Sequence, residues 1–236
     1  MSKEKEINNE IVSELVTTGV IVGHKRSKTH PKMKPFIAMN RNDIDFLDPE
    51  NTLTSIDNAV KFINEKVGPD DFVLCVASSA TAQESILSFA KHFGFPYVTT
   101  RWLGGTLTNF KVISDRMRYY VDLKSKKEKG ELEKYTKKEQ LKFSEEISKL
   151  AISFDGLLRM SKLPAVLFVV DPKTTDTAVK EAVKLNIPVV AILDTNDDPR
   201  TVTQPIFAND HSKQSIAWVI GKIQAGIEAG RKQGAK

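Results

Sequence analysis

The sequence predicts an α/β fold in which a doubly wound parallel sheet carries an inserted antiparallel helical hairpin. Three continuous apolar runs, FVLCVA from Phe72, AVLFVV from Ala165 and PVVAIL from Pro188, have the length of strands and lack the alternation of a half-exposed sheet. Helical patterns separate these runs. Continuous apolar strands that alternate with helices indicate strands buried on both faces, and therefore a parallel sheet covered by helices.

A helix and a strand pair are predicted before this core begins. Apolar residues at helical spacing predict a helix over Ile7–Thr18, with Gly19 as its C-terminal stop. After a basic segment, Phe36–Met39 and Ile44–Leu47 are predicted to pair as short strands around a turn at Asn40–Asp43.

Helices and strands then alternate along the core. Asp48 and Pro49 predict a helix start, because aspartate caps a helix and proline fits its first turn. In chain order, the predicted core elements are this helix with Leu53, Ile56, Ala59, Val60 and Ile63, the strand from Phe72, a helix over Ala80–His92, a short segment at Pro96–Val98, the strand from Ala165, a helix over Asp176–Leu185, the strand from Pro188 and a helix over Ser212–Ala229.

The hairpin is predicted between Arg101 and about Leu158. Apolar residues recur there in steps of three and four, as in a heptad seam: Phe110, Ile113, Met117 and Tyr120, then Phe143, Ile147, Leu150, Phe154 and Leu157. A polar break over Lys124–Gly130 separates two helices, and Thr136 with Glu139 forms a capping box that opens the second. We expect the hairpin to project as a coiled coil, with a third layer on the core as the alternative.

Three parts follow from this interpretation. Residues 1–100 form the first part of the α/β core with the N-terminal helix and the basic loop, residues 101–158 form the hairpin, and residues 159–236 complete the core. A single cysteine, Cys75, excludes an internal disulfide and a cysteine zinc cluster, and its apolar strand makes it a core residue. The charged start MSKEKEINNE and the lack of a membrane-spanning apolar run predict a cytosolic protein.

Positive charge is concentrated in one segment. The chain has 35 Lys and Arg against 30 Asp and Glu, a net charge of +5. Residues 15–42 hold no acid and contain six bases: Lys25, Arg26, Lys28, Lys32, Lys34 and Arg41. Bases without neighbouring carboxylates suit a polyanion, although a solvated surface is the competing interpretation. Nearby His24, His30, Pro31 and Pro35 argue against an amphipathic helix and predict an irregular, extended basic loop.

Recognisable enzyme motifs are absent from the sequence. No GxGxxG, Walker-type or GxSxG motif occurs. Asp171 and Asp194 directly follow two predicted strands, so they could form a magnesium or acid/base site, but capping of loop amides is the favoured interpretation. His24 and His30 could share a metal, but beside six bases hydrogen bonding to RNA or backbone is favoured. We expect no enzyme, metal or cofactor.

Several strings resemble one known family. RWLGGTLTNFK from Arg101, GHK from Gly23, HPKMKPFI from His30 and ILDTNDDP from Ile192 are similar to the bacterial form of small-subunit ribosomal protein S-two. The resemblance implies a flavodoxin-like core with a coiled-coil hairpin and a structural role in the small ribosomal subunit. The partners it implies are small-subunit ribosomal RNA, neighbouring ribosomal proteins and the mRNA-binding protein S-one, without a membrane or a small-molecule substrate.

The charge pattern and the resemblance together predict a set of RNA-binding residues. Phosphate contacts are expected from Lys25, Arg26, Lys28, Lys32, Lys34 and Arg41, hydrogen bonds from His24 and His30, and further RNA contacts from Arg101, Asn109 and Lys111 where the hairpin leaves the core. Trp102 is expected to anchor this hinge, with base stacking as the alternative, and Gly104 and Gly105 to permit its tight turn.

Two other classes compete with a structural ribosomal protein. One is a small α/β enzyme that acts on a phosphorylated substrate through Asp171 and Asp194. The other is a protein-interaction adaptor that uses the hairpin.

Overall fold

A five-stranded parallel sheet forms the centre of the protein. The structure, a computed structural model, describes residues 2–234. Its central strands are β4 (Val73–Ala77), β5 (Tyr97–Val98), β6 (Val166–Val170), β7 (Val189–Leu193) and β8 (Gln204–Phe207), in the spatial order β5-β4-β6-β7-β8. The predicted parallel α/β core is therefore confirmed. β8 was not predicted.

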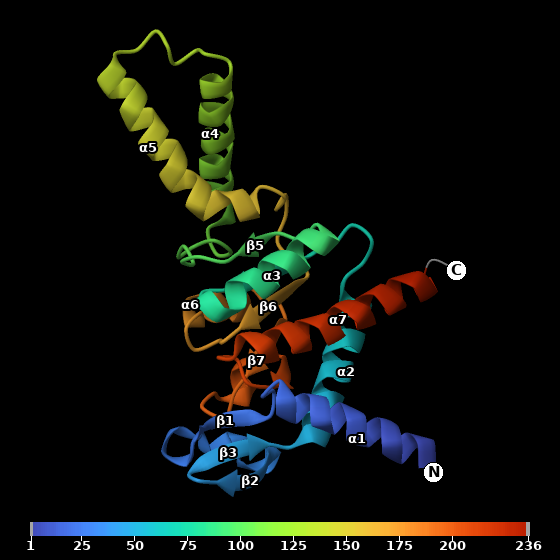
Figure 1. Cartoon of the computed structure of the whole chain (residues 1–236). Helices are drawn as coiled ribbons and strands as arrows, with labels where there is room; N and C mark the ends of the chain where they lie inside the picture. Colours follow the sequence, from blue (N-terminus) through green and yellow to red (C-terminus); the bar gives the residue numbers. More distant parts are fainter. Residues whose placement is uncertain (1, 235–236) are drawn as a thin grey trace.

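Helices cover both faces of this sheet (Figure 1). One face packs against α1 (Ser2–Thr17), α2 (Pro49–Lys66), α3 (Ala80–Phe93) and α7 (Lys213–Gly234), and the other packs against α6 (Asp176–Lys184) and the first turns of α4 (Phe110–Glu128). The strands supply both sides by alternation. In β6, for example, Phe168 belongs to the first apolar cluster, and its neighbours Leu167 and Val169 belong to the second.

The strand order places a switch point in the middle of the sheet. Numbered along the chain, the five strands lie in the order 2-1-3-4-5, which is the flavodoxin-like arrangement. β4 and β6 are neighbours whose connections leave in opposite directions, so a crevice opens between their carboxyl ends. Loops that carry chemistry in such folds lie along this carboxyl edge.

A second, three-stranded antiparallel sheet lies beside the core. It has the order β1-β3-β2, with β1 (Val22–Lys25), β2 (Ile37–Arg41) and β3 (Ile44–Leu47). The predicted pairing of the last two strands is confirmed, and φ angles of +52° at Asn42 and +59° at Asp43 close a two-residue hairpin turn. Met33 and Leu47 are fully buried against the core.

The prediction of an irregular, extended basic loop is wrong for much of residues 23–36. The segment contains most of β1 and two short 3₁₀ helices, η1 (Arg26–Lys28) and η2 (Pro31–Phe36). Local geometry explains η2. The His30 ring accepts a hydrogen bond from Lys32 N at the start of η2, and Pro31 suits the first position of a helix. An α-helix is absent from this segment, as predicted.

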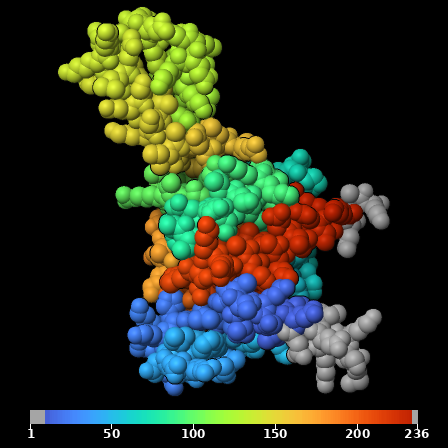
Figure 2. All heavy atoms as spheres, viewed as in Figure 1, coloured from blue at the N-terminus to red at the C-terminus, as the bar shows by residue number. Residues whose placement is uncertain are grey.

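Two helices extend away from the core. α4 and α5 (Lys137–Phe154) lie beside each other, and Figure 2 shows their outer parts standing clear of the rest of the molecule. The capping box that opens α5 is confirmed, since the Glu139 carboxylate accepts from Thr136 N at 3.0 Å. Ile113, Met117 and Tyr120 in α4 are buried in the second apolar cluster. Knobs-into-holes packing farther out remains a prediction.

The other predicted helices occur, but α1 begins at Ser2 rather than Ile7 and α7 ends at Gly234 rather than Ala229. α4 continues to Glu128, so the break before α5 lies later than the predicted Lys124–Gly130. Gly19 ends α1 with a φ of +70°, and Asp48 caps α2 by accepting from Glu50 N. Within residues 2–234, no helix combines the length and the apolar character required to cross a membrane.

Candidate nucleic-acid interface

The basic segment presents its cations on the surface of the three-stranded sheet and its turns. All six side chains are exposed, and none forms an ion pair with another described residue: Lys25, Arg26, Lys28, Lys32, Lys34 and Arg41. They come from β1, η1, η2 and β2. No direct ion pair within the described part of the chain therefore engages these six cations, which are left to attract a polyanion.

Thr195, which follows β7, holds the basic segment against the core. Its hydroxyl accepts from His24 N at 2.8 Å, and its carbonyl accepts from His30 N at 2.8 Å. A side chain at Gly23 would collide with Thr195 and approach the Asp45 carbonyl oxygen to 2.8 Å, so glycine permits this contact. The basic segment that carries the six cations is thus bonded to the core through Thr195.

Asp45 fixes the segment from the other side. Its carboxylate is almost fully buried and accepts from Thr29 Oγ1 at 2.5 Å and from Asn40 Nδ2 at 2.6 Å. These bonds join the end of η1 to the β2–β3 hairpin. A buried carboxylate needs hydrogen-bond partners, so the bonds from Thr29 and Asn40 constrain the position of the neighbouring cations.

The two predicted histidines lie beside acidic side chains. His24 Nδ1 is 2.9 Å from Asp194 Oδ2, and His30 Nε2 is 4.0 Å from Asp198 Oδ2. The Asp194 carboxylate raises the pKa of His24, against the effect of partial burial. The structure thus turns both imidazoles toward carboxylates at the edge of the basic surface.

A buried acidic cluster lies at the carboxyl ends of β6, β7 and β8. Asp171, Asp194, Asp197 and Asp210 are each at most 5% exposed. Burial raises the pKa of Asp197 to about 7, and repulsion from Asp210 adds to the shift. Burial likewise raises the pKa of Asp210 to about 6, whereas its carboxylate raises the pKa of His211 to about 9.

For Asp171, the predicted capping role is confirmed. Its Oδ1 accepts from Lys173 N at 3.2 Å and Thr174 N at 3.1 Å. Asp171, Asp210 and His211 also offer ligand atoms within 4.8 Å of one another, a set able to hold a cation. Sequence reasoning did not identify this set, because Asp210 and His211 follow a strand that was not predicted.

The second predicted group lies in the segment before α4 and in the first turn of that helix. Arg101, Asn109 and Lys111 are exposed. Trp102 is 8% exposed, and its Nε1 donates to Glu181 Oε1 at 3.1 Å. Gly105 has a φ of +89°, which glycine adopts without strain.

Glu181 on α6 was not predicted, yet it organises this segment. Besides Trp102, its carboxylate accepts from Gly105 N at 2.7 Å, Leu107 N at 3.0 Å, Thr108 N at 3.1 Å and Thr108 Oγ1 at 3.1 Å. Burial opposes ionisation, but these hydrogen bonds prevail and lower the pKa of Glu181. In the sequence this residue resembles an ordinary surface charge of an amphipathic helix.

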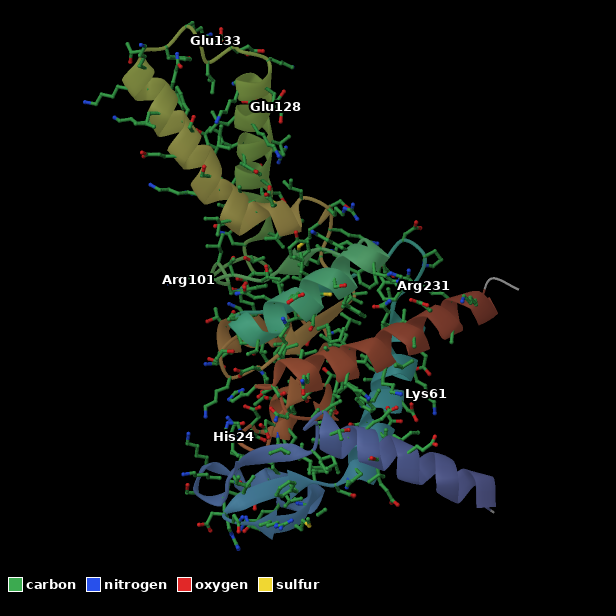
Figure 3. All side chains as sticks on the ribbon, in the orientation of Figure 1. His24, Lys61, Arg101, Glu128, Glu133 and Arg231 are labelled. Atoms are coloured by element: carbon green, nitrogen blue, oxygen red, sulfur yellow. The ribbon has the colours of Figure 1, made fainter. Side chains whose placement is uncertain are left out.

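The two predicted groups do not form one cluster. Arg101 follows β5, at one edge of the parallel sheet, whereas the basic segment docks on the loop after β7, toward the other edge. β5 and β7 are three strand spacings apart, about 14 Å. His24 and Arg101 nevertheless lie on the same side of the molecule (Figure 3).

Fold and site together define a flavodoxin-like α/β protein with an added basic sheet and a projecting helical pair. A family model described as "Ribosomal protein S2" matches residues 15–230. The chain belongs to the ribosomal protein S2 family. Membership of this family indicates a structural, non-enzymatic protein of the small ribosomal subunit.

Individual relatives agree with this assignment. The "Small ribosomal subunit protein uS2" of Dictyoglomus thermophilum is 42% identical over 221 residues, which cover 94% of this chain and 90% of the relative. The protein of the same name from a Roseiflexus species is 44% identical over 91% of this chain and 82% of its own length. That of Chloroflexus aurantiacus is 39% identical over 94% of both chains.

Proposed function

We propose that this protein binds small-subunit ribosomal RNA through the basic segment of residues 23–41. The observation that carries this proposal is the exposed set of six cations, which have no ion-pair partner among residues 2–234 and lie on a sheet packed against the core. Such cations neutralise phosphates and release condensed counterions. Family membership supplies the ribosomal setting.

The contacts are predicted to position the RNA rather than to read its sequence. Lys25, Arg26, Lys28, Lys32 and Lys34 contact phosphates, and Arg41 extends the same surface along β2. In A-form RNA the bases of the major groove are out of reach, so backbone and shape dominate recognition. His24 and His30 contribute hydrogen bonds at the edge of this surface.

Arg101, Asn109 and Lys111 form a second RNA contact in this proposal. Trp102, Gly104 and Gly105 act as the hinge between the core and residues 101–158, whose outer helices pack as a coiled coil. In the assembled subunit, neighbouring ribosomal proteins contact this protein, which also supports recruitment of the mRNA-binding protein S-one.

Sedimentation tests the proposal directly. The tagged chain is expressed in its host, and the lysate is sedimented through sucrose gradients at moderate and at high salt. We expect co-migration with the small subunit, and release of the free protein when salt screens the phosphate contacts. A chain that stays at the top of both gradients would overturn the proposal.

A further inference from the structure

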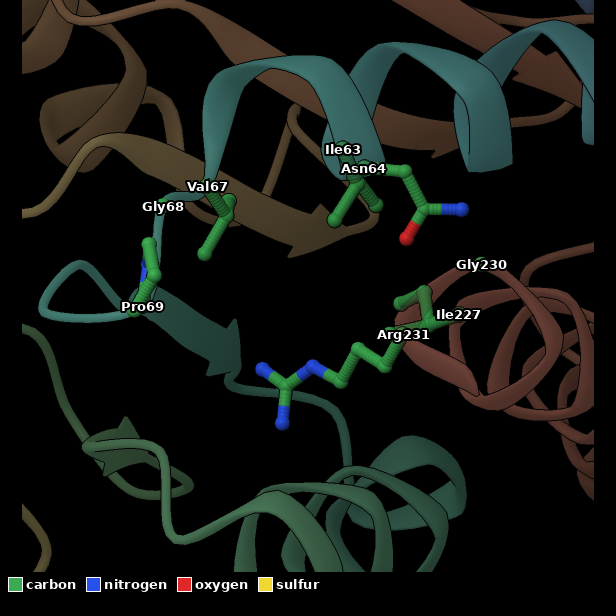
Figure 4. Close-up of a pocket in the computed structure, with 8 residues that line it drawn as sticks. All are labelled: Ile63, Asn64, Val67, Gly68, Pro69, Ile227, Gly230 and Arg231. Atoms are coloured by element: carbon green, nitrogen blue, oxygen red, sulfur yellow. The ribbon is translucent and has the colours of Figure 1, made fainter. Parts of the chain in front are cut away.

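A cavity of about 520 Å³ lies between the C-terminal ends of α2 and α7 (Figure 4). Its apolar lining comes from Ile63 of α2, from Val67 and Pro69 just after that helix, and from Ile227 of α7. The volume lies within the range of ligand-binding pockets, about 300–1,000 Å³. The lining includes no residue of the basic segment, of the buried acidic cluster or of the segment before α4.

The guanidinium group of Arg231 points into this cavity (Figure 4). Its central carbon lies 4.9 Å from the ring centroid of Phe93 and 5.3 Å from that of Phe95, and these cation–π contacts hold the group in place. Within residues 2–234, Arg231 forms no ion pair, and the cavity lining contains no carboxylate. A planar guanidinium held in this way is arranged to bind a carboxylate through two hydrogen bonds.

Asn64 adds a hydrogen-bond acceptor to the cavity. Its Nδ2 donates to the Gly226 carbonyl oxygen at 3.4 Å, which orients the amide and leaves Oδ1 without a partner among the described residues. Gly230 makes room for this amide, because a β-carbon there would collide with it. The side chains of Asn64 and Arg231 enter the cavity from its two helices (Figure 4). A matching ligand therefore combines a carboxylate, an N–H donor and an apolar group.

We propose that this cavity binds the C-terminal end of a partner polypeptide whose last residue is apolar. The chain-terminal carboxylate pairs with the Arg231 guanidinium, and the last peptide N–H donates to Asn64 Oδ1. The last side chain packs against Ile63, Val67 and Ile227. A fatty acid has the carboxylate and the apolar chain but no donor for Asn64, so a polypeptide is the better match. This inference goes beyond the proposed function, because it involves neither RNA nor the basic segment.

NMR spectroscopy of the isotope-labelled full chain tests the proposal. The chain is titrated with the hexapeptide Gly-Ser-Gly-Ser-Ala-Leu carrying a free C-terminal carboxylate, with the same peptide ending in a carboxamide, and separately with octanoate. The backbone amides of Val67, Gly68 and Gly230 report binding in the cavity. Arg231→Gln is the test variant, and Lys232→Gln, at the adjacent exposed residue outside the cavity lining, is the matched control.

We expect the free-acid peptide to shift these amides to saturation, and affinity to fall about tenfold for the carboxamide and for Arg231→Gln, with no change in Lys232→Gln. The carboxamide tests the carboxylate contact in the unaltered protein. Equal affinities of the acid and the carboxamide, equal affinities of the two variants, or no shift around the cavity would overturn the proposal. Shifts caused by octanoate but not by the peptide would overturn the assignment to a polypeptide. RNA binding is tested separately by sedimentation, so each proposal can fail without the other.

Discussion

Glu181 illustrates how one carboxylate can shape a long segment of irregular chain. Its two oxygens accept five hydrogen bonds from Trp102, Gly105, Leu107 and Thr108, on the chain about 75 residues earlier. Backbone N–H groups buried in a loop need acceptors, and a carboxylate offers several lone pairs at once. The position of Arg101 and of the α4 start therefore depends on a residue of α6.

We predict that Glu181→Gln lowers the free energy of unfolding by about 3 kcal/mol, because the amide group cannot accept all these bonds and places its own donor against N–H groups. Urea unfolding at pH 7 measures the loss. Glu145→Gln, on the exposed face of α5, is the control and should change stability by less than about 0.5 kcal/mol. Equal effects of the two substitutions would contradict the assigned role of Glu181.

The same carboxylate should make stability sensitive to acid. Because hydrogen bonds lower the pKa of Glu181 in the folded state, its contribution is present above the unfolded value of 4.5 and is lost as pH falls through the folded value. The stability difference between the wild type and Glu181→Gln should therefore shrink in acid. Urea unfolding at pH 7 and pH 3 tests this, and a difference that stays constant would show that Glu181 does not act through its charge.

Cys75 offers a reporter of global unfolding. Its side chain is fully buried in β4, and burial raises the pKa of the thiol above its ordinary value. Thiol reagents should therefore label the native protein extremely slowly and label the denatured protein at once. Rapid labelling under native conditions would show that β4 opens locally.

Residue roles differ in how visible they are in a sequence. The capping by Asp171 follows from its place after an apolar strand, which is a local signal. Thr195 bonds to His24, 171 residues earlier in the chain, and Glu181 bonds to Trp102, 79 residues earlier. In the sequence, the patterns around Thr195 and Glu181 resemble those of surface residues. Only the fold brings such partners together, so sequence periodicity cannot predict them.

At the scale of elements, the core strands that the sequence predicts are those with continuous apolar runs, which indicate burial on both faces. β4, β6 and β7 are buried along their whole length. β8 contains Pro205 and only four residues, and it exists because it pairs with β7 at the sheet edge. β1 is equally short and is set by pairing with β3. Elements defined by pairing carry little local signal.

The contact between α2 and α7 depends on small residues. A β-carbon at Gly226 would lie 2.6 Å from Val60 Cγ1, whereas one at Gly221 meets no atom within 4 Å. Toward the C-terminal ends of the two helices the packing opens into a cavity of about 520 Å³, which Arg231 enters beside Ile63 and Val67 (Figure 4). The two helices therefore approach closely from Gly226 to Gly230, where a β-carbon would collide with the Asn64 side chain.

We predict opposite effects of the same substitution at these two glycines. Gly226→Ala should destabilise the protein by about 1–3 kcal/mol, because the new methyl group overlaps a branched side chain. Gly221→Ala should stabilise it by about 0.5–1 kcal/mol through helix propensity alone. Thermal and urea unfolding compare the two variants, and stabilisation by both would show that the helices can separate without cost.

At the scale of the whole molecule, an exposed basic surface adjoins a buried acidic cluster. His24 lies where the two meet, 2.9 Å from Asp194. The acids are enclosed at the carboxyl edge, whereas the six cations of the basic segment face solvent. A polyanion approaching from solution therefore meets the cations first, and association should be driven by their field.

This arrangement predicts that RNA affinity depends on where lysines lie rather than on net charge. We compare a triple variant, Lys25→Gln, Lys28→Gln and Lys32→Gln, with an isoelectric control, Lys61→Gln, Lys91→Gln and Lys184→Gln, whose side chains are exposed on α2, α3 and α6. Each lost phosphate contact should reduce the slope of log affinity against log salt by about 0.7–0.9. The first variant should therefore lose about two units of slope and bind ribosomal RNA more weakly, whereas the control keeps the wild-type slope. Filter binding at several salt concentrations measures both, and matching slopes for the two variants would show that net charge, not the basic segment, governs binding.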